Sequence, residues 1–226
     1  MSYMLQQESP TIVGITGMSG SGKTTVAKIL KEAHAYVIDA DQVAHSTMKK
    51  DRDAYREIVE AFGTVILDDE GEINRSVLGE IVFDDKEKLA QLEGIIHPKV
   101  KKLIGLQIYR ACLSGYDLIV LDAALLVESG LRGICNSVWL ITADHDVKLA
   151  RIMARDNITK EAAEKRLANR VSDEALKPYA SIALDNNGND LDFLKSVAFK
   201  ALEIELDALD ALEANRPDES ELEDEE

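Results

Sequence analysis

The stretch GITGMSGSGKTTVAK, residues 14–28, decides the fold of this chain. Positions 17–24 within it match the phosphate-loop pattern G-x-x-x-x-G-K-[ST]. An apolar run at 11–16 comes directly before the loop and predicts a buried parallel strand, and a helix is predicted over 23–34. Because a chance glycine-rich turn would lack these flanks, the stretch predicts a loop that binds ATP or GTP together with magnesium.

Each residue type in the loop has a chemical reason to be there. Glycine has no Cβ, so backbone N–H groups can turn inward and form a nest for a polyphosphate. The helix that begins near Lys23 directs its positive dipole end at the same anion. The Lys23 ammonium adds a full charge for the β- and γ-phosphates and is expected to be catalytic, and the Thr24 hydroxyl can ligate Mg²⁺. The residues expected to bind the nucleotide are Gly17, Gly20, Ser21, Gly22, Lys23, Thr24 and Thr25.

Four more apolar runs follow along the chain and predict further strands. They lie at 35–39, 117–122, 137–142 and 181–186. Helical patterns separate the runs, the last of them at 190–213, and no signal for a strand-turn-strand hairpin occurs between them. The sequence therefore predicts an α/β fold with a five-stranded parallel sheet and helices on both faces.

The pattern between the second and third predicted strands is mostly helical and too long for a simple crossover. We therefore expect residues 48–114 to form an inserted helical region that binds the acceptor substrate. Two interruptions are predicted inside it, a turn at 68–74 and a break between helices at His97-Pro98. A second insertion at 148–177 is rich in Arg, Lys and Glu and is expected to form a lid. The predicted nucleotide-binding core consists of the remaining parts, 11–47, 115–147 and 178–213.

The formal net charge of −16 lies mostly at the C-terminal end. Residues 203–226 contain twelve acidic residues and a single basic one, Arg216. Residues 214–226 are too polar to bury, so a disordered acidic tail that aids solubility is predicted there. An acidic chain repels nucleic acid and anionic membranes, and no apolar run approaches the roughly 20 residues that span a bilayer. We therefore expect neither nucleic acid nor a membrane as a partner.

The cysteines and the first residues bear on location. Cys112 and Cys135 are far apart and have no metal-ligand spacing. The first residues, MSYMLQQESPT, lack the basic and apolar regions of a secretory signal. In a chain without an export signal the two cysteines are expected to be reduced, buried thiols, and the protein is expected to be cytoplasmic.

A phosphate loop does not by itself name a reaction, because GTPases, ATP-driven motors and small-molecule kinases share it. The guanine-reading Asn-Lys-x-Asp motif of GTPases is absent from the sequence. Motors usually carry a hydrolytic carboxylate beside the strand-end aspartate, but Asp122 is followed by Ala123 and Ala124. Elimination favours a kinase, with a regulatory nucleotide-binding module as the alternative from another class.

A kinase of this fold needs a carboxylate near the γ-phosphate, which orients or deprotonates the acceptor hydroxyl. The end of the second predicted strand, VIDADQVAH at 37–45, supplies Asp39 and Asp41. Residues two apart on an extended segment point the same way, and this strand ends at the sheet edge where α/β proteins place their ligands. The residues alone leave Asp41 open between a general base and a cap of the helix expected from Gln42.

Five stretches, taken in order, resemble the motif set of the dephospho-CoA kinase family. They are TGMSGSGKTTVAKIL (16–30), YVIDADQVAH (36–45), LEGIIHPKV (92–100), VLDAALLVESGL (120–131) and ARIMARDNITKEAAEKRL (150–167). The resemblance extends from residue 11 to about 205. It implies a nucleoside-kinase-like P-loop fold and transfer of the γ-phosphate of ATP, with Mg²⁺, to the ribose 3′-hydroxyl of dephospho-CoA. That reaction is the last step of coenzyme A synthesis. We expect a monomer or a weak homo-oligomer; another small-molecule kinase is the second interpretation.

The resemblance also implies roles for the carboxylates. Asp41 matches the proposed general base of the family, which favours catalysis over capping. Asp39 belongs to the same motif and is implied to lie at the substrate or close to the metal. Asp122, at the end of an apolar strand, resembles a Walker B-type magnesium group that would act with Thr24, and a helix cap is its alternative role.

Basic residues complete the implied site. Arg75 and His97, in the helical insertion, are implied to face the acceptor. Arg151 and Arg155 match the entry of the family's lid and are expected to neutralise charge on the transferred group. Arg166 is a further candidate for the same role.

Three positions depart from the family pattern. Met18 stands where a second glycine is usual, Ala124 replaces a usual proline, and Arg170 stands where glutamine is common. None of these changes removes a group that performs chemistry. Met18 is expected to affect nucleotide affinity, and Arg170 the contacts between the lid and adenine.

Overall fold

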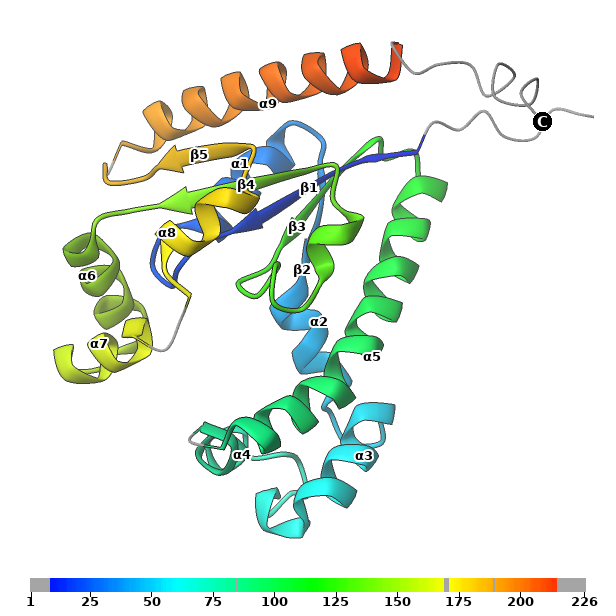
Figure 1. The fold of residues 1–226 in the computed structure, drawn as a ribbon, viewed down its shortest axis with the longest axis vertical. Helices are drawn as coiled ribbons and strands as arrows, with labels where there is room; N and C mark the ends of the chain where they lie inside the picture. Colours follow the sequence, from blue (N-terminus) through cyan, green and yellow to red (C-terminus); the bar gives the residue numbers. More distant parts are fainter. Residues whose placement is uncertain (1–8, 84, 169–170, 189, 215–226) are drawn as a thin grey trace, which may run out of the picture.

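The five apolar runs form one sheet in the order β2-β3-β1-β4-β5, and all neighbouring strands are parallel (Figure 1). The computed structural model describes residues 9–83, 85–168, 171–188 and 190–214. The strands are β1 (Thr11–Thr16), β2 (Tyr36–Asp39), β3 (Leu118–Asp122), β4 (Ser137–Thr142) and β5 (Ile182–Asp185). The predicted five-stranded parallel sheet is confirmed.

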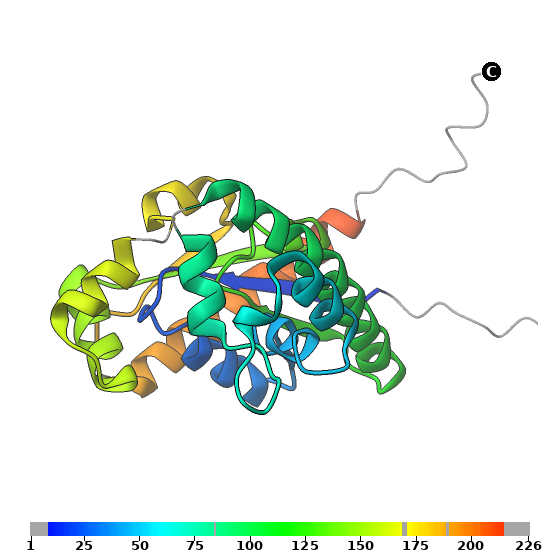
Figure 2. The ribbon, with the colours of Figure 1, turned by 90° about the horizontal axis from the view of Figure 1, so that it is seen from below.

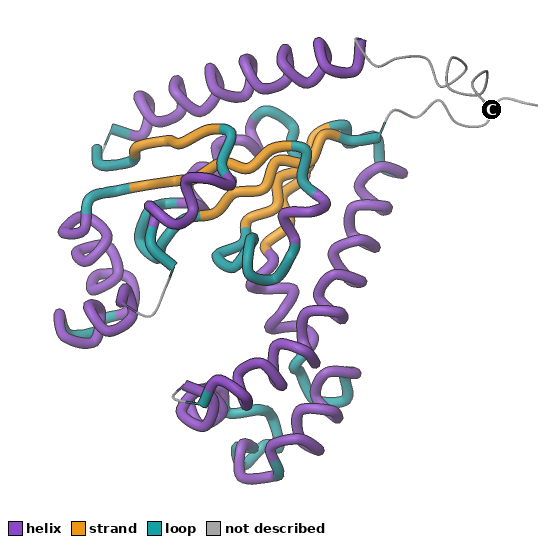
Figure 3. Tube along the Cα trace, viewed as in Figure 1, coloured by secondary structure: helices purple, strands orange, loops and turns teal. Residues whose placement is uncertain are grey.

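Helices cover both faces of the sheet, because parallel strands need crossover connections. The α-helices are α1 (Lys23–Glu32), α2 (Ala40–Thr47), α3 (Asp53–Phe62), α4 (Arg75–Phe83), α5 (Lys86–Leu113), α6 (His145–Asp156), α7 (Lys160–Ala168), α8 (Asp173–Leu176) and α9 (Leu191–Ala214). Short 3₁₀ helices lie at Thr64–Ile66, Leu131–Ile134 and Lys177–Tyr179. Figure 3 shows how the strands run through the middle of this helical envelope.

Successive side chains of each strand point to opposite faces, and each face has its own apolar core. Val13 and Ile15 of β1 pack in the core that includes side chains of α1 and α9. Ile119 and Leu121 of β3 pack in the other core, with side chains of α2 and α5. These strands are apolar on both faces, so they read in the sequence as continuous apolar runs.

The helical segment between β2 and β3 extends away from the sheet and has a core of its own (Figure 1). Ala54 and Ile58 of α3 pack there with Leu78 and Val82 of α4. Seen from below, this region lies in front of the sheet (Figure 2). The predicted helical character of the insertion and the turn at 68–74 are confirmed.

The predicted break at His97-Pro98 is wrong, because α5 runs without interruption from Lys86 to Leu113. A proline inside a helix removes one backbone hydrogen bond and usually kinks the helix, and α5 changes direction along its length (Figure 1). Apolar packing on both sides of Pro98 offsets this cost. Ile95 packs against the core that α3 and α4 form, whereas Ile104 belongs to the core between the sheet and helices α2 and α5.

Cys112 and Cys135 are free thiols as predicted, but they are half-buried rather than buried, because they pack at the margin of the α2–α5 core. Partial burial raises the pKa of the Cys135 thiol to about 12, so this thiol stays protonated near neutral pH. None of the helices in the described ranges is both long and apolar enough to cross a membrane. Ala214 ends α9, and the rest of the predicted acidic tail, 215–226, lies outside the described residues.

Candidate active site

The phosphate loop connects β1 to α1, and at three of its glycines, Gly17, Gly20 and Gly22, other atoms come too close for a side chain. Gly17 has a φ of 142°, and a Cβ there would lie 2.2 Å from the Ile141 carbonyl oxygen. Gly22 has a φ of 97°, and a Cβ there would lie 2.0 Å from the Asn186 side-chain nitrogen. At Gly17 and Gly22, as at Gly20, both the lack of space and the positive φ require glycine.

Lys23 is the first residue of α1, and its side chain folds back over the loop. Its Nζ donates hydrogen bonds to the carbonyl oxygens of Gly17 (2.9 Å) and Met18 (3.2 Å). The N-terminal end of α1 carries the positive end of the helix dipole. Ammonium and helix end together concentrate positive charge at the loop, as the binding of a polyphosphate requires.

Thr24 and Asp122 come together because β1 and β3 are neighbours in the sheet. The Thr24 hydroxyl donates to Asp122 Oδ2 at 2.9 Å. Asp122 is only 7% exposed, and this burial raises the pKa of its carboxyl above the ordinary value. The hydrogen bond from Thr24 and the charge of Lys23 counteract part of that effect. The Asp122 carboxylate is thus directed at the phosphate loop.

The donor atoms at this point fit Mg²⁺. This ion prefers oxygen ligands and usually takes one or two carboxylates together with water and substrate phosphates. The Thr24 hydroxyl and the Asp122 carboxylate are such oxygens, and Asp39 lies in register with Asp122 on the neighbouring strand. The described residues contain no group of three or more His, Cys, Asp or Glu arranged to hold a metal ion on their own.

Asp39 and Asp41 lie at the end of β2 but have different surroundings. Asp39 is the N-cap of α2, and its Oδ1 accepts a hydrogen bond of 2.8 Å from the Gln42 N–H. Because α2 begins at Ala40, Asp41 lies in the first helical turn and not on an extended segment as expected. The capping role that the sequence left open for Asp41 therefore belongs to Asp39.

A cavity of about 370 Å³ joins the phosphate loop to the end of β2 and to both inserted regions. Small-molecule sites typically enclose about 300–1,000 Å³. The predicted site residues that line this cavity are Gly17, Lys23, Thr24, Asp39, Asp41, Arg75, Asp122, Arg155 and Arg166. Positive charge, carboxylates and arginines face one space, an arrangement that can hold a phosphate donor and orient a hydroxyl beside it.

Arg155 and Arg166 reach the cavity from the α6–α8 segment, residues 145–176. Both guanidinium groups pair with Asp156, with an Nε–Oδ1 distance of 2.7 Å for Arg155. Arg155 Nη2 also donates to the Ser19 hydroxyl at 3.4 Å, so this arginine already contacts the loop.

Arg151 and His97 occupy other places. Arg151 is not among the residues that line the cavity; it donates instead to the backbone carbonyls of Gly20 (3.4 Å) and Gly188 (3.2 Å). Arg151 therefore contacts the backbone of the loop and not the cavity. His97 is half-buried on α5 and is also not among the lining residues of the described chain.

Several residues around the loop were not predicted from the sequence. Glu128 and His45 line the cavity. Asn186, directly after β5, donates through Nδ2 to the Ser21 carbonyl at 2.7 Å. A polar residue at the carboxyl end of a parallel strand is a signal that could have identified Asn186. Further contacts to the loop come from Lys148 and Asp173.

The three departures from the family pattern have different outcomes. Met18 and Ala124 both line the cavity, so each replaces a family residue at the site itself. Arg170 lies outside the described residues.

Removal of the Asn186 side chain is expected to loosen the phosphate loop. Asn186 is 7% exposed, so Asn186→Ala leaves the Ser21 carbonyl without this donor in a buried place. We expect the free energy of unfolding to fall by about 1–3 kcal/mol, the usual cost of an unsatisfied buried polar group. Urea denaturation measures this difference, and an unchanged midpoint and slope would show that the contact does not anchor the loop.

Comparison with known proteins agrees with this site. A model of the dephospho-CoA kinase family matches residues 11–192. The dephospho-CoA kinase of Geobacter sulfurreducens is 40% identical over 177 residues, which are 78% of this chain and 90% of that protein. The solved structure of TT1252 from Thermus thermophilus has a TM-score of 0.77 and 30% identity, and the match covers 88% of this chain and 99% of that one. Dephospho-CoA kinase from Campylobacter jejuni has a TM-score of 0.60 and 29% identity, over 85% and 95% of the two chains.

The matched region contains the whole phosphate loop, the end of β2, both insertions and Asn186. The chain therefore belongs to the dephospho-CoA kinase family and is an ATP-dependent phosphotransferase with an alcohol group as acceptor.

Proposed function

We propose that this chain transfers the γ-phosphate of ATP to the ribose 3′-hydroxyl of dephospho-CoA and yields coenzyme A and ADP, the last step of coenzyme A synthesis. The observation that carries this proposal is that the phosphate loop, Asp41 and Arg75 line the same cavity. The relatives from Geobacter sulfurreducens and Campylobacter jejuni are dephospho-CoA kinases, which supports the same acceptor.

On the donor side, the loop N–H groups and Lys23 hold the phosphates of ATP. Lys23 Nζ donates to two loop carbonyls, and its flexible side chain can carry the ammonium to a β- or γ-phosphate oxygen. Thr24 and Asp122 would hold Mg²⁺, which when bound neutralises part of the phosphate charge. Arg151 keeps the loop backbone in place through its contact with Gly20.

On the acceptor side, Asp41 is the general base. The hydroxyl oxygen attacks the γ-phosphorus while the bond from this phosphorus to the β–γ bridging oxygen breaks, the hydroxyl proton passes to Asp41, and ADP leaves. Asp39 is less suited to this role, because its Oδ1 already accepts from Gln42 as the helix cap. Arg75 lies beside the cavity and can bind an acceptor phosphate through its planar guanidinium.

The inserted regions divide the remaining tasks. Residues 48–114 bind the acceptor, and residues 148–177 form the lid. His97 contacts the acceptor at a place outside the cavity that the phosphate loop lines. Arg155 and Arg166, both at the cavity, neutralise charge that develops on the transferred group. The cytoplasmic location and the monomeric or weakly associated state stay predictions.

Formation of coenzyme A tests the proposal. The purified protein receives ATP and Mg²⁺ with dephospho-CoA, and parallel reactions contain adenosine or shikimate as the acceptor. We expect coenzyme A and ADP in equal amounts from dephospho-CoA and no phosphorylated product from the other two. ADP release without coenzyme A, or phosphorylation of adenosine or shikimate at a comparable rate, contradicts the proposal.

A further inference from the structure

The peptide groups of Met18, in the phosphate loop, are held on both sides. Its N–H donates to Asp173 Oδ1 at 3.3 Å, and its carbonyl oxygen accepts from Lys23 Nζ at 3.2 Å. Met18 therefore connects Asp173, the first residue of α8, to Lys23 of the phosphate loop, although Met18 and Asp173 are 155 residues apart in the sequence.

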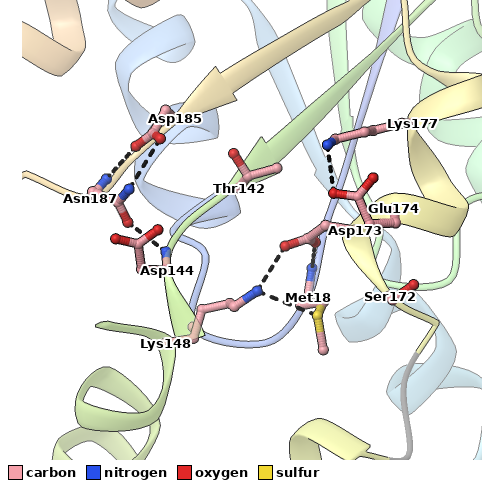
Figure 4. Close-up of polar contacts among 12 residues, drawn as sticks. Met18, Thr142, Asp144, Lys148, Ser172, Asp173, Glu174, Lys177, Asp185 and Asn187 are labelled. Atoms are coloured by element: carbon pink, nitrogen blue, oxygen red, sulfur yellow. Dashed lines mark hydrogen bonds and ion pairs between the residues drawn. The ribbon is translucent and has the colours of Figure 1, made fainter. Parts of the chain in front are cut away.

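Asp173 is itself paired with Lys148 of α6. Lys148 Nζ lies 2.7 Å from Asp173 Oδ2, and the two side chains are only 8% and 14% exposed. The same ammonium lies 3.4 Å from the Met18 sulfur. Figure 4 shows the Lys148 side chain pointing at the Asp173 carboxylate and at the Met18 sulfur. One carboxylate oxygen accepts from the Lys148 ammonium, and the other accepts from the Met18 N–H.

Backbone and apolar contacts bring α6 onto the loop at the same point. A Cβ on Gly20 would lie 2.6 Å from the Lys148 carbonyl oxygen, so the two backbones are in direct contact. The Met18 side chain packs against the apolar cluster that contains Leu149 and Ile152 of α6. The ion pair thus lies at a contact that apolar packing already holds together.

A buried ion pair is a weak source of stability, because loss of hydration offsets much of the attraction between the charges. Adhesion of α6 to the loop therefore does not require Lys148 and Asp173. The ion pair instead fixes the orientation of the Asp173 carboxylate. Lys148 holds the carboxylate of Asp173 in one orientation, and in that orientation the carboxylate accepts from the Met18 N–H.

We propose that Lys148 and Asp173 are positioning residues for the phosphate loop, which they orient through the peptide N–H of Met18. The Met18 carbonyl in turn holds the ammonium of Lys23. A loop that is already ordered loses less freedom when the nucleotide binds, so the pair increases the affinity for ATP. This inference rests on the proposed use of ATP and is independent of which alcohol is the acceptor.

Two double variants isolate the hydrogen bond to Met18. K148M/D173N and K148M/D173L both lack the buried charges, and asparagine and leucine are similar in shape. Only asparagine retains an oxygen that can accept from the Met18 N–H. Replacement of both charges together is chosen because apolar substitution of a whole buried pair usually preserves folding. Titration calorimetry on the full chain, without acceptor, measures ATP affinity, and hydrogen exchange measures protection of the Met18 amide.

We expect K148M/D173L to bind ATP roughly tenfold more weakly than K148M/D173N. The reason is that leucine offers no acceptor for the Met18 N–H, and an unpaired N–H costs free energy in the ordered loop. Protection of the Met18 amide is expected to be highest in the wild type, lower in the asparagine variant, which keeps the acceptor without the lysine that orients it, and lost in the leucine variant. The KM for dephospho-CoA is expected to be the same in both. Equal ATP affinities, or equal protection, overturn the proposal.

An exposed ion pair in the same segment is the control. Lys177 and Glu174 lie 2.6 Å apart, with side chains 52% and 78% exposed. K177M is expected to leave ATP affinity unchanged, and a loss as large as that of K148M/D173L contradicts the positioning role. If the protein binds ATP but does not phosphorylate dephospho-CoA, the proposed acceptor fails while the calorimetric comparison stays valid.

Discussion

The Asp41→Asn variant is expected to lose about 10²- to 10⁴-fold in kcat, the range that general bases contribute. An amide cannot take up the proton of the acceptor hydroxyl, so the attacking oxygen keeps its proton as the new bond to phosphorus forms. The affinity for ATP is expected to change far less, because the loop and Lys23 hold the phosphates. Coenzyme A formation measures kcat, and calorimetry measures the dissociation constant of ATP.

Asp39→Asn is the matched control, since it makes the same chemical change two residues away. Asparagine is as good an N-cap as aspartate, so α2 is expected to start at the same residue in this variant. The loss in kcat is expected to be much smaller than for Asp41→Asn. Should Asp39→Asn be the more damaging change, the general base would be Asp39, and wild-type turnover in Asp41→Asn would exclude Asp41.

The elements that local sequence could predict are those whose neighbours in space are also neighbours in the chain. The runs at 11–16 and 137–142 match β1 and β4 residue for residue, because a strand buried on both faces is apolar throughout. Pro98 misled the prediction, because its local cost is visible in the sequence and the packing that offsets it is not. Ile95 and Ile104 meet two different cores, and neither core is visible within the helix itself.

The same distinction applies to the site. The phosphate loop and the carboxylates at the end of β2 could be predicted, because each lies within one short segment. Asn186 reaches Ser21 across 165 residues, and this contact depends on β5 standing next to β4 in the sheet. The contacts of Lys148 and Asp173 likewise depend on how α6 and α8 lie on the loop. Strand order and helix docking are tertiary results that a local pattern does not specify.

The Lys23→Met variant is expected to lower kcat/KM for ATP by about 10²- to 10³-fold. This is the usual effect of removing one preorganised positive charge that stabilises the transferred phosphoryl group. Methionine has a similar length and reaches the same place, but it has no charge and no donor for the carbonyls of Gly17 and Met18. The loss is expected in both ATP affinity and the chemical step. Single-turnover measurements at saturating ATP separate the two.

Lys31→Met is the control for Lys23→Met, since Lys31 is an exposed lysine in the last turn of the same helix, away from the loop. A ligand that binds only the folded state raises the thermal midpoint according to its affinity. ATP is therefore expected to raise the midpoint of wild type and of Lys31→Met, and to have little effect on Lys23→Met. Full stabilisation of Lys23→Met by ATP would mean that backbone N–H groups and the end of α1 bind the phosphates without the lysine. In that case the hydrogen bonds from Lys23 to Gly17 and Met18 would hold the loop in shape, and the kinetic loss would have to arise in the transfer step alone.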